Sequence, residues 1–129
     1  MEYTCEVTID STLEKVFKLF EDNMLVGKRA VPGNVSQMVF TYDGIERTMT
    51  ETIESVYKPY EIVSVYEVED TYNRCVIKFK VDHLSVVFRM EVEFRFKEEL
   101  NQDIEKYAES TLNQMTEFKK FVESIEENY

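Results

Sequence analysis

The sequence predicts an α+β fold in which a curved antiparallel β-sheet wraps around a long C-terminal helix, with one or two short helices after the first strand. Three observations predict it: a strand-like alternation at the N-terminus, a run of alternating segments in the middle, and an apolar stripe of helical period at the end. The chain has 129 residues. This length suits one core, so we expect residues 1–129 to form a single domain.

The charge balance excludes some classes of partner. The chain carries 15 Lys and Arg against 26 Asp and Glu, a formal net charge of -11. Nucleic acid binding needs clustered basic residues, so we expect no nucleic acid partner. The N-terminus has no basic region followed by an apolar run, and no stretch approaches the ~20 apolar residues of a membrane span. We therefore expect a cytoplasmic protein with no membrane span.

The first elements follow from a change of period. The alternating residues of the first strand are Tyr3, Cys5, Val7 and Ile9. Ser11 and Glu14 then form a capping-box pattern, with Ser11 as the N-cap of a helix. The apolar face of that helix contains Leu13, Val16, Phe17 and Phe20. Residues 23–30 could form a second short helix, which the segment Val31–Asn34 should end because it contains Pro and Gly.

A hairpin follows, with Asp43 and Gly44 as its turn. The pairs that this turn implies are Tyr42 with Ile45, Phe40 with Arg47, and Met38 with Met49. The register sends Met49, Glu51 and Ile53 to one side of the next strand. The segment Ile62–Glu69 continues the sheet, with Ile62, Ser64, Tyr66 and Val68 on one face.

The last two strands and the final helix give the clearest pattern. Apolar residues alternate with mostly charged residues through 75–81 and 86–96. The sheet is therefore predicted to have one apolar face and one solvent-exposed face. Lys78 and Lys80 lie on the outer face, where glutamates of neighbouring strands could pair with them. A helix is predicted from about Gln102 to Glu127. Its apolar stripe contains Ile104, Ala108, Leu112, Met115, Phe118, Val122 and Ile125.

This order of elements resembles the START-like, or SRPBCC, helix-grip superfamily, which includes pollen allergens, polyketide cyclases and the activator of a heat-shock chaperone. The segment Tyr57–Val63 is similar to the proline-containing turn between the third and fourth strands of those proteins. One feature departs from the plant members, because Asp43 and Gly44 stand where they have a Gly-rich loop.

The resemblance implies a cavity between the concave sheet and the terminal helix. The residues that would line it are Phe40, Met49, Tyr66, Phe79, Phe88, Met90, Tyr107, Met115 and Phe118. Such cavities take small apolar or amphipathic molecules. The alternative is that these bulky side chains fill the space as ordinary core, since packed interiors tolerate few voids.

Two charged residues face the same side. Arg47 and Glu51 lie inward by the hairpin register, where a charge needs a partner. Along one strand they are about 13 Å apart, too far to pair with each other. Arg47 either extends from the rim to water or contacts a ligand. Glu51 is either turned outward by a β-bulge or is a pocket carboxylate, with Ser64 and the Tyr66 hydroxyl beside it.

Three functions remain open. The first is binding of a small apolar or amphipathic ligand. The second is a protein partner, bound through the acidic surface or the helix, as in chaperone activators. The third is a cyclase-type enzyme that uses Glu51 as acid or base with a Tyr donor. We predict no cofactor and no metal, because the only histidine, His83, lies in a predicted turn and the buried thiols Cys5 and Cys75 are far apart.

Overall fold

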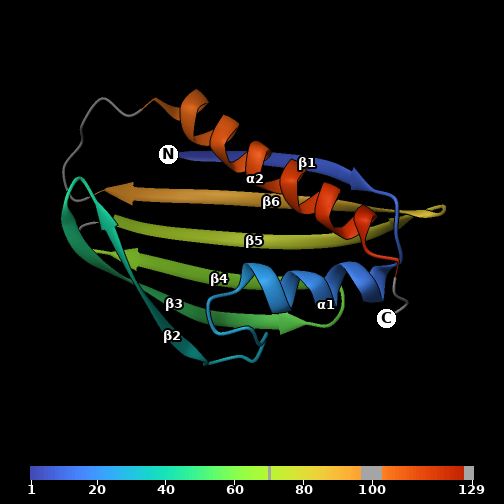
Figure 1. Cartoon of the computed structure of the whole chain (residues 1–129), viewed down its shortest axis with the longest axis horizontal. Coiled ribbons are helices and arrows are strands. Elements are labelled where there is room, and N and C mark those ends of the chain that lie inside the picture. The colour runs from blue at the N-terminus through green and yellow to red at the C-terminus, as the bar shows by residue number, and fades with distance from the viewer. Residues whose placement is uncertain (70, 97–102, 127–129) are drawn as a thin grey trace.

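The computed structural model describes residues 1–69, 71–96 and 103–126. In chain order the elements are β1 (Glu2–Ile9), α1 (Leu13–Met24), β2 (Val35–Tyr42), β3 (Ile45–Tyr57), β4 (Glu61–Val68), β5 (Thr71–Asp82), β6 (Ser85–Phe96) and α2 (Ile104–Ser124). The six strands form one sheet in the order β1-β6-β5-β4-β3-β2, and all neighbouring strands are antiparallel (Figure 1). The predicted fold class is confirmed.

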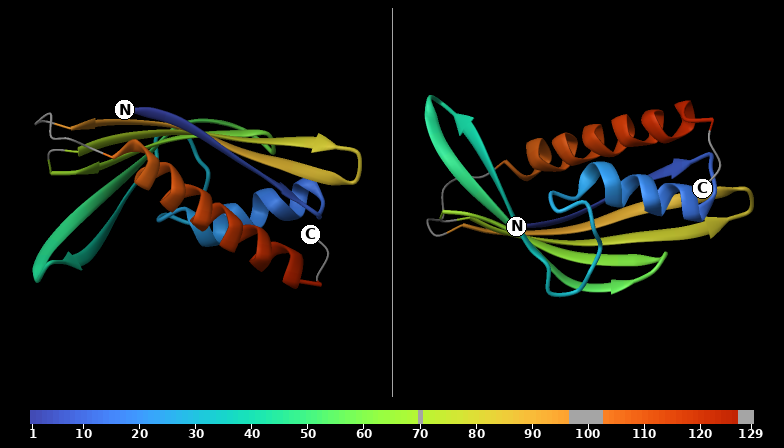
Figure 2. Two further views of the ribbon diagram at one scale, coloured as in Figure 1. Left: turned by 90° about the horizontal axis from the view of Figure 1, so that it is seen from above. Right: turned by 60° about the horizontal axis from the view of Figure 1, so that its bottom comes forward.

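Both helices cover the same face of the sheet. α2 crosses β1 and β6 obliquely, while α1 lies over the middle of the sheet (Figure 1). The β2–β3 hairpin bends out of the plane of the other strands toward the helices, which makes the sheet concave (Figure 2). Met115, Phe118 and Val122 are buried on the sheet-facing side of α2, opposite the buried Phe88 of β6. The apolar stripe of the helix and the apolar face of the sheet therefore form one core.

The register of the first hairpin follows its turn. Tyr42 pairs with Ile45 and Met38 with Met49, as the Asp43–Gly44 turn predicts. Gly44 has a φ of 72°, which is accessible to glycine at no steric cost. A β-bulge occurs in β3 between Ile53 and Ser55. Because it lies beyond Glu51, it does not turn that side chain outward.

Two local predictions are wrong. The N-cap of α1 is Thr12, whose Oγ1 accepts from Lys15 N, and not Ser11. Residues 25–30 form no second helix, because α1 ends at Met24 and the chain then turns. The physical reason for that turn is a pair of buried glutamates, described below.

The C-terminal helix forms where it was predicted but ends earlier than expected, at Ser124, with the predicted stripe residue Ile125 as its C-cap in extended backbone. Asp103 caps it, because its Oδ1 accepts from Glu105 N at 3.1 Å and from Lys106 N at 3.3 Å. The predicted end residues 102 and 127 lie outside the described residues.

On the opposite face of the sheet, Lys78 Nζ lies 3.0 Å from Glu91 Oε2, which is one of the predicted cross-strand pairs.

Two properties of the described residues bear on location and metals. Neither α1 nor α2 is long and apolar enough to cross a membrane. Within the described ranges, no group of three or more His, Cys, Asp or Glu side chains could hold a metal ion. The cytoplasmic location stays a prediction.

Candidate functional site

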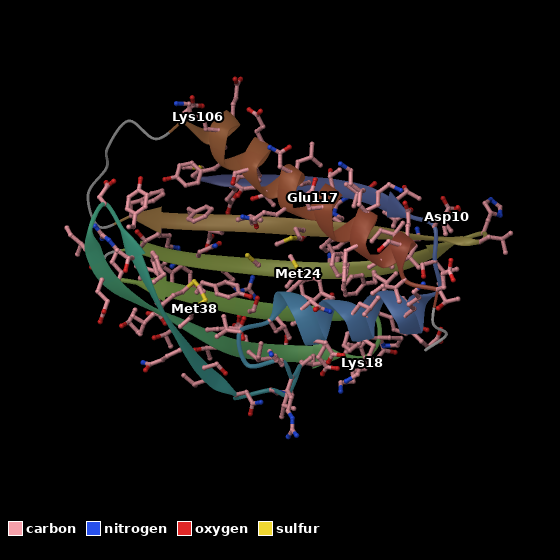
Figure 3. All side chains as sticks on the ribbon, in the orientation of Figure 1. Asp10, Lys18, Met24, Met38, Lys106 and Glu117 are labelled. Atoms are coloured by element: carbon pink, nitrogen blue, oxygen red, sulfur yellow. The ribbon has the colours of Figure 1, made fainter. Side chains whose placement is uncertain are left out.

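A partly enclosed cavity of about 590 Å³ lies between the concave sheet and the first half of α2. The end of α1 and the turn after it form a second wall, and the β2–β3 hairpin forms a third. The lining residues are Tyr3, Phe20, Asn23, Met24, Leu25, Val26, Met38, Met49, Tyr66, Asn73, Cys75, Ile77, Met90, Val92, Phe94, Tyr107, Ser110, Thr111, Gln114 and Met115. In Figure 3, Met24 and Met38 mark the helix wall and the hairpin wall.

The structure brings five of the predicted site residues together around this cavity. They are Met49, Tyr66, Met90, Tyr107 and Met115. They come from four different elements, β3, β4, β6 and α2. Six others do not line it. These are Phe40, Arg47, Glu51, Phe79, Phe88 and Phe118.

Three of those six belong to an aromatic cluster beside the cavity. Phe79 and Phe88 stack across β5 and β6 with ring centroids 5.3 Å apart, and Phe118 meets Phe88 edge-on at 5.5 Å. Phe20 of α1 contacts all three rings at 5.5 to 5.6 Å. These four rings and Phe17, which packs on Phe79, form the phenylalanine cluster. It fills the space between helices and sheet at that end, and Phe20 is where it borders the cavity.

Several polar groups of the cavity wall are hydrogen-bonded within the protein. The Tyr3 hydroxyl and Thr111 Oγ1 are 2.6 Å apart and join β1 to α2. Cys75 Sγ donates to Asn73 Oδ1 at 3.4 Å. Burial raises the pKa of the Cys75 thiol from 9.0 to about 12, so this thiol is protonated at neutral pH. The wall is thus mainly apolar with a few hydrogen-bonding groups.

Glu51 is the buried carboxylate of the site, with only 1% of its surface exposed. Its Oε2 accepts from Val26 N at 3.0 Å and its Oε1 from Gly27 N at 3.1 Å. A Cβ on Gly27 would lie 2.3 Å from Ser36 Oγ, so a larger residue there would force the Ser36 side chain to move. Glu51 therefore fixes the turn that supplies Val26 to the cavity wall.

A second buried glutamate holds the other end of that turn. Glu21 Oε2 accepts from Ala30 N at 2.7 Å, and Lys58 Nζ lies 3.6 Å from the same oxygen. Side-chain carboxylates thus bind backbone N–H groups at both ends of residues 26–30. This is why the predicted second helix does not form, since its N–H groups would have to point along the helix axis instead.

Tyr66 connects Glu51 to the cavity. The two residues are direct cross-strand partners on β4 and β3. Burial, followed by the nearby charge of Glu51, raises the pKa of the Tyr66 phenol. Ser64 is fully buried beside them. Its hydroxyl makes no hydrogen bond of normal geometry to the described residues, yet it is close enough to Tyr66 to oppose that rise in pKa.

Arg47 and Phe40 lie farther out on the hairpin, as a cross-strand pair. Arg47 Nη1 lies 3.0 Å from Glu69 Oε2, and its guanidinium is 5.9 Å from the centre of the Tyr42 ring. The Arg47 side chain is 26% exposed. These contacts match the rim position that was one of its two predicted roles, with the head held by Glu69.

An open groove of about 810 Å³ runs outside the cavity, between the end of α1 and α2. Four residues line both spaces and separate them. They are Asn23, Met24, Ser110 and Gln114. Phe118 and Phe121 supply apolar surface to the groove, and its charged residues are Lys106, Glu109 and Glu117. Lys106 and Glu117 lie along α2 in Figure 3.

Sequence reasoning missed most of the wall supplied by the helices and by β5. Thr111 and Gln114 interrupt the apolar stripe of α2 next to Met115, and such polar breaks in a buried stripe were a usable signal. Asn73 could also have been predicted, because it lies on the same face of β5 as Cys75 and Ile77. The turn residues Leu25 and Val26 carried no such signal.

Solved structures share this architecture. Mll3558 from Rhizobium loti superposes with a TM-score of 0.79 at 14% identity, over 93% of this chain and 95% of that one. Ara h 8.0201 superposes with a TM-score of 0.74 at 14% identity, over 97% of this chain and 99% of that one. The chain has the helix-grip fold. DynU16, from the dynemicin biosynthetic locus, gives 0.75 at 8% identity, over 95% of this chain and 47% of that one. No protein-family model and no curated protein matches the chain.

Proposed function

We propose that this protein binds a small hydrophobic or amphipathic molecule in the cavity between the sheet and α2, as a member of the START-like superfamily. The observation that carries the proposal is the cavity itself. Its volume of about 590 Å³ is within the ~300–1,000 Å³ of small-molecule sites, and its wall is mainly apolar with a few polar groups. The likeness of fold to the solved structures supports it.

The residues divide between contact and support in this proposal. Met49, Tyr66, Met90, Tyr107 and Met115 contact the ligand, together with the wall residues around them. The phenylalanine cluster closes one end of the cavity. Methionine side chains are flexible and polarisable, so the five lining methionines, from α1, β2, β3, β6 and α2, can adapt to the outline of a ligand.

Catalysis by Glu51 has weaker support than binding. Both carboxylate oxygens already accept backbone N–H groups, at 3.0 and 3.1 Å. A general base has to offer a lone pair toward the reacting proton, with a hydrogen bond of about 2.6–3.2 Å or one through water. The contacts of Glu51 favour a positioning role in the wall over an acid/base role.

Fluorescence titration with N-phenyl-1-naphthylamine, an uncharged probe that brightens in apolar sites, tests the proposal. Val92→Trp should abolish saturable binding, because Val92 lines the cavity and the larger ring occupies it. Val87→Trp is the matched control, since Val87 is on the opposite face of the same strand. Absence of probe binding to the folded wild-type protein, or equal binding by both variants, would refute the proposal.

Protein binding is a second candidate, and the exposed edge strand β2 favours it. β2 is the last strand of the sheet and contains no charged residue, which leaves its edge open to pairing. Its outward side chains Val35 and Val39 are 62% and 58% exposed. A partner strand would add there. Val39→Lys should then abolish binding of a partner that the wild-type protein captures. The control Leu84→Lys, in the exposed turn between β5 and β6, should leave that binding unchanged.

A further inference from the structure

The cavity wall contains hydrogen-bonding groups but no ion. None of the described residues that line the cavity is Asp, Glu, Lys, Arg or His. A buried carboxylate, Glu51, nevertheless lies directly behind the wall. We infer that the cavity selects uncharged ligands and rejects anionic ones, and that Glu51 sets this selection. The inference rests on the proposed function and narrows its ligand class.

The position of Glu51 makes its charge effective. It is 1% exposed, and its cross-strand partner Tyr66 lines the cavity. Val26 N, to which Glu51 is hydrogen-bonded, belongs to another lining residue. Water is kept away from the carboxylate by these neighbours, so its field is screened less than that of a surface group. An anion placed in the cavity would meet this field across one layer of side chains.

The cationic groups nearby are already engaged. Arg47 lies inward on the same strand as Glu51 but does not line the cavity; its Nη1 is ion-paired with Glu69 at 3.0 Å, and its buried Nε has no hydrogen-bond partner among the described residues. Lys58 is close to the second buried glutamate, Glu21, at 3.6 Å. In the open groove outside the cavity, Lys106 is accompanied by two glutamates, Glu109 and Glu117. Neither the wall nor the groove therefore offers an anion a net positive surface.

The Tyr66 hydroxyl adds a preference for one kind of uncharged group. Burial, followed by the nearby charge of Glu51, raises the Tyr66 pKa, so the phenol keeps its proton at neutral pH. The phenol oxygen then remains an acceptor. A ligand with a hydroxyl or N–H group can donate to it, whereas a carboxylate or sulfonate cannot.

Two probes of one skeleton test the selection. N-phenyl-1-naphthylamine is uncharged, and 8-anilino-1-naphthalenesulfonate carries a sulfonate on the same rings. At pH 8 we expect the uncharged probe to bind about tenfold or more tightly than the anion, from the repulsion of two like charges in a poorly screened site. Equal affinities would overturn the inference and leave the proposed function standing. Failure of both probes to bind would overturn both.

A charge-removing variant assigns the effect to its source. Glu51→Gln should lower the ratio of the dissociation constant of the anionic probe to that of the uncharged probe to about threefold or less. Glu109→Gln, which removes one charge from the groove, should leave this ratio unchanged. An unchanged ratio in folded Glu51→Gln protein, or an equal fall in both variants, would overturn the role of Glu51.

Salt gives a readout that needs no variant. Between 0.05 and 0.5 M NaCl the Debye length falls from about 14 to about 4 Å, which screens surface charges but not a buried one. If Glu51 sets the selection, the wild-type ratio should change less than about threefold. If the net charge of -11 on the surface sets it, the ratio should approach one, and that result would overturn the inference.

Discussion

The two ends of the β5–β6 pair are built from the same two strands, yet one end is filled and the other is hollow. At the filled end Phe79 is paired with Phe88, and their rings stack at 5.3 Å. Toward the hollow end the pairs become Ile77 with Met90 and then Cys75 with Val92, all four of which line the cavity. Side-chain bulk therefore falls between the Phe79–Phe88 pair and the Cys75–Val92 pair, where the space opens, before Phe94 closes the far side of the cavity opposite Asn73.

The end of α1 accounts for the difference. Phe17 and Phe20 of α1 fill the gap between α2 and the sheet, and the helix ends one turn later at Met24. Beyond Met24 the chain turns away, so α1 does not fill the space between the concave sheet and α2 there (Figure 1). The comparison teaches that this cavity comes from where α1 stops, in addition to the curvature of the sheet.

Truncation at matched positions on β6 should separate the two ends most strongly. Phe88→Ala should lower the free energy of unfolding by about 3–5 kcal/mol, because Phe88 is fully buried among three other aromatic rings. Met90→Ala, at a partly buried position next to space that is already empty, should cost about 2 kcal/mol or less, at the low end of the range for buried methionines. Urea unfolding measured by circular dichroism gives both values. Similar losses at the two positions would show that the cavity end is packed as tightly as the filled end.

The register of the hairpin and the inward residues of the filled end could be predicted from the sequence, because both depend on local features of the chain. The turn at Asp43–Gly44 sets the register of β2 and β3, and a two-residue period then decides every inward side chain up to the bulge at Ile53. Strict alternation likewise placed Phe79 and Phe88 on the core face. Such features depend on residues close together along the chain.

The hollow end depended on contacts that the sequence does not show locally. The turn after α1 is fixed by Glu51, which is 24 and 25 residues away from the N–H groups of Gly27 and Val26 that it binds. The pattern of residues 23–30 alone favoured a helix, and nothing near it indicated those partners. Whether an inward aromatic side chain belongs to the phenylalanine cluster or lines the cavity likewise depends on where α1 ends.

Enlarging a side chain should sharpen the comparison with a smaller effect. Val86 and Val92 share the inward face of β6, and only Val92 lines the cavity. Val86→Leu should destabilise the protein by about 1–3 kcal/mol because the filled end has no room for another methylene. Val92→Leu should change stability by less than about 0.5 kcal/mol, since the added group enters empty space. Equal losses measured by urea unfolding would contradict a hollow end.

The smallest expected effect reports whether the hollow end excludes water. The pKa of Cys75 rises from 9.0 to about 12 through burial alone. Below pH 9 the thiol is neutral in both the folded and the unfolded chain, so it leaves stability unchanged. Above pH 9 the unfolded chain loses its proton first, and stability falls as the pH rises toward 12.

The comparison with Cys75→Ala isolates this contribution, because Tyr66 and the other titrating groups are common to both proteins. Between pH 8 and pH 10, wild-type protein should lose about 1 kcal/mol more of its unfolding free energy than the variant. Urea unfolding under reducing conditions at the two pH values measures the difference. Parallel losses would mean that water reaches the thiol, and the wall would then be more polar than the uncharged, mainly apolar lining indicates.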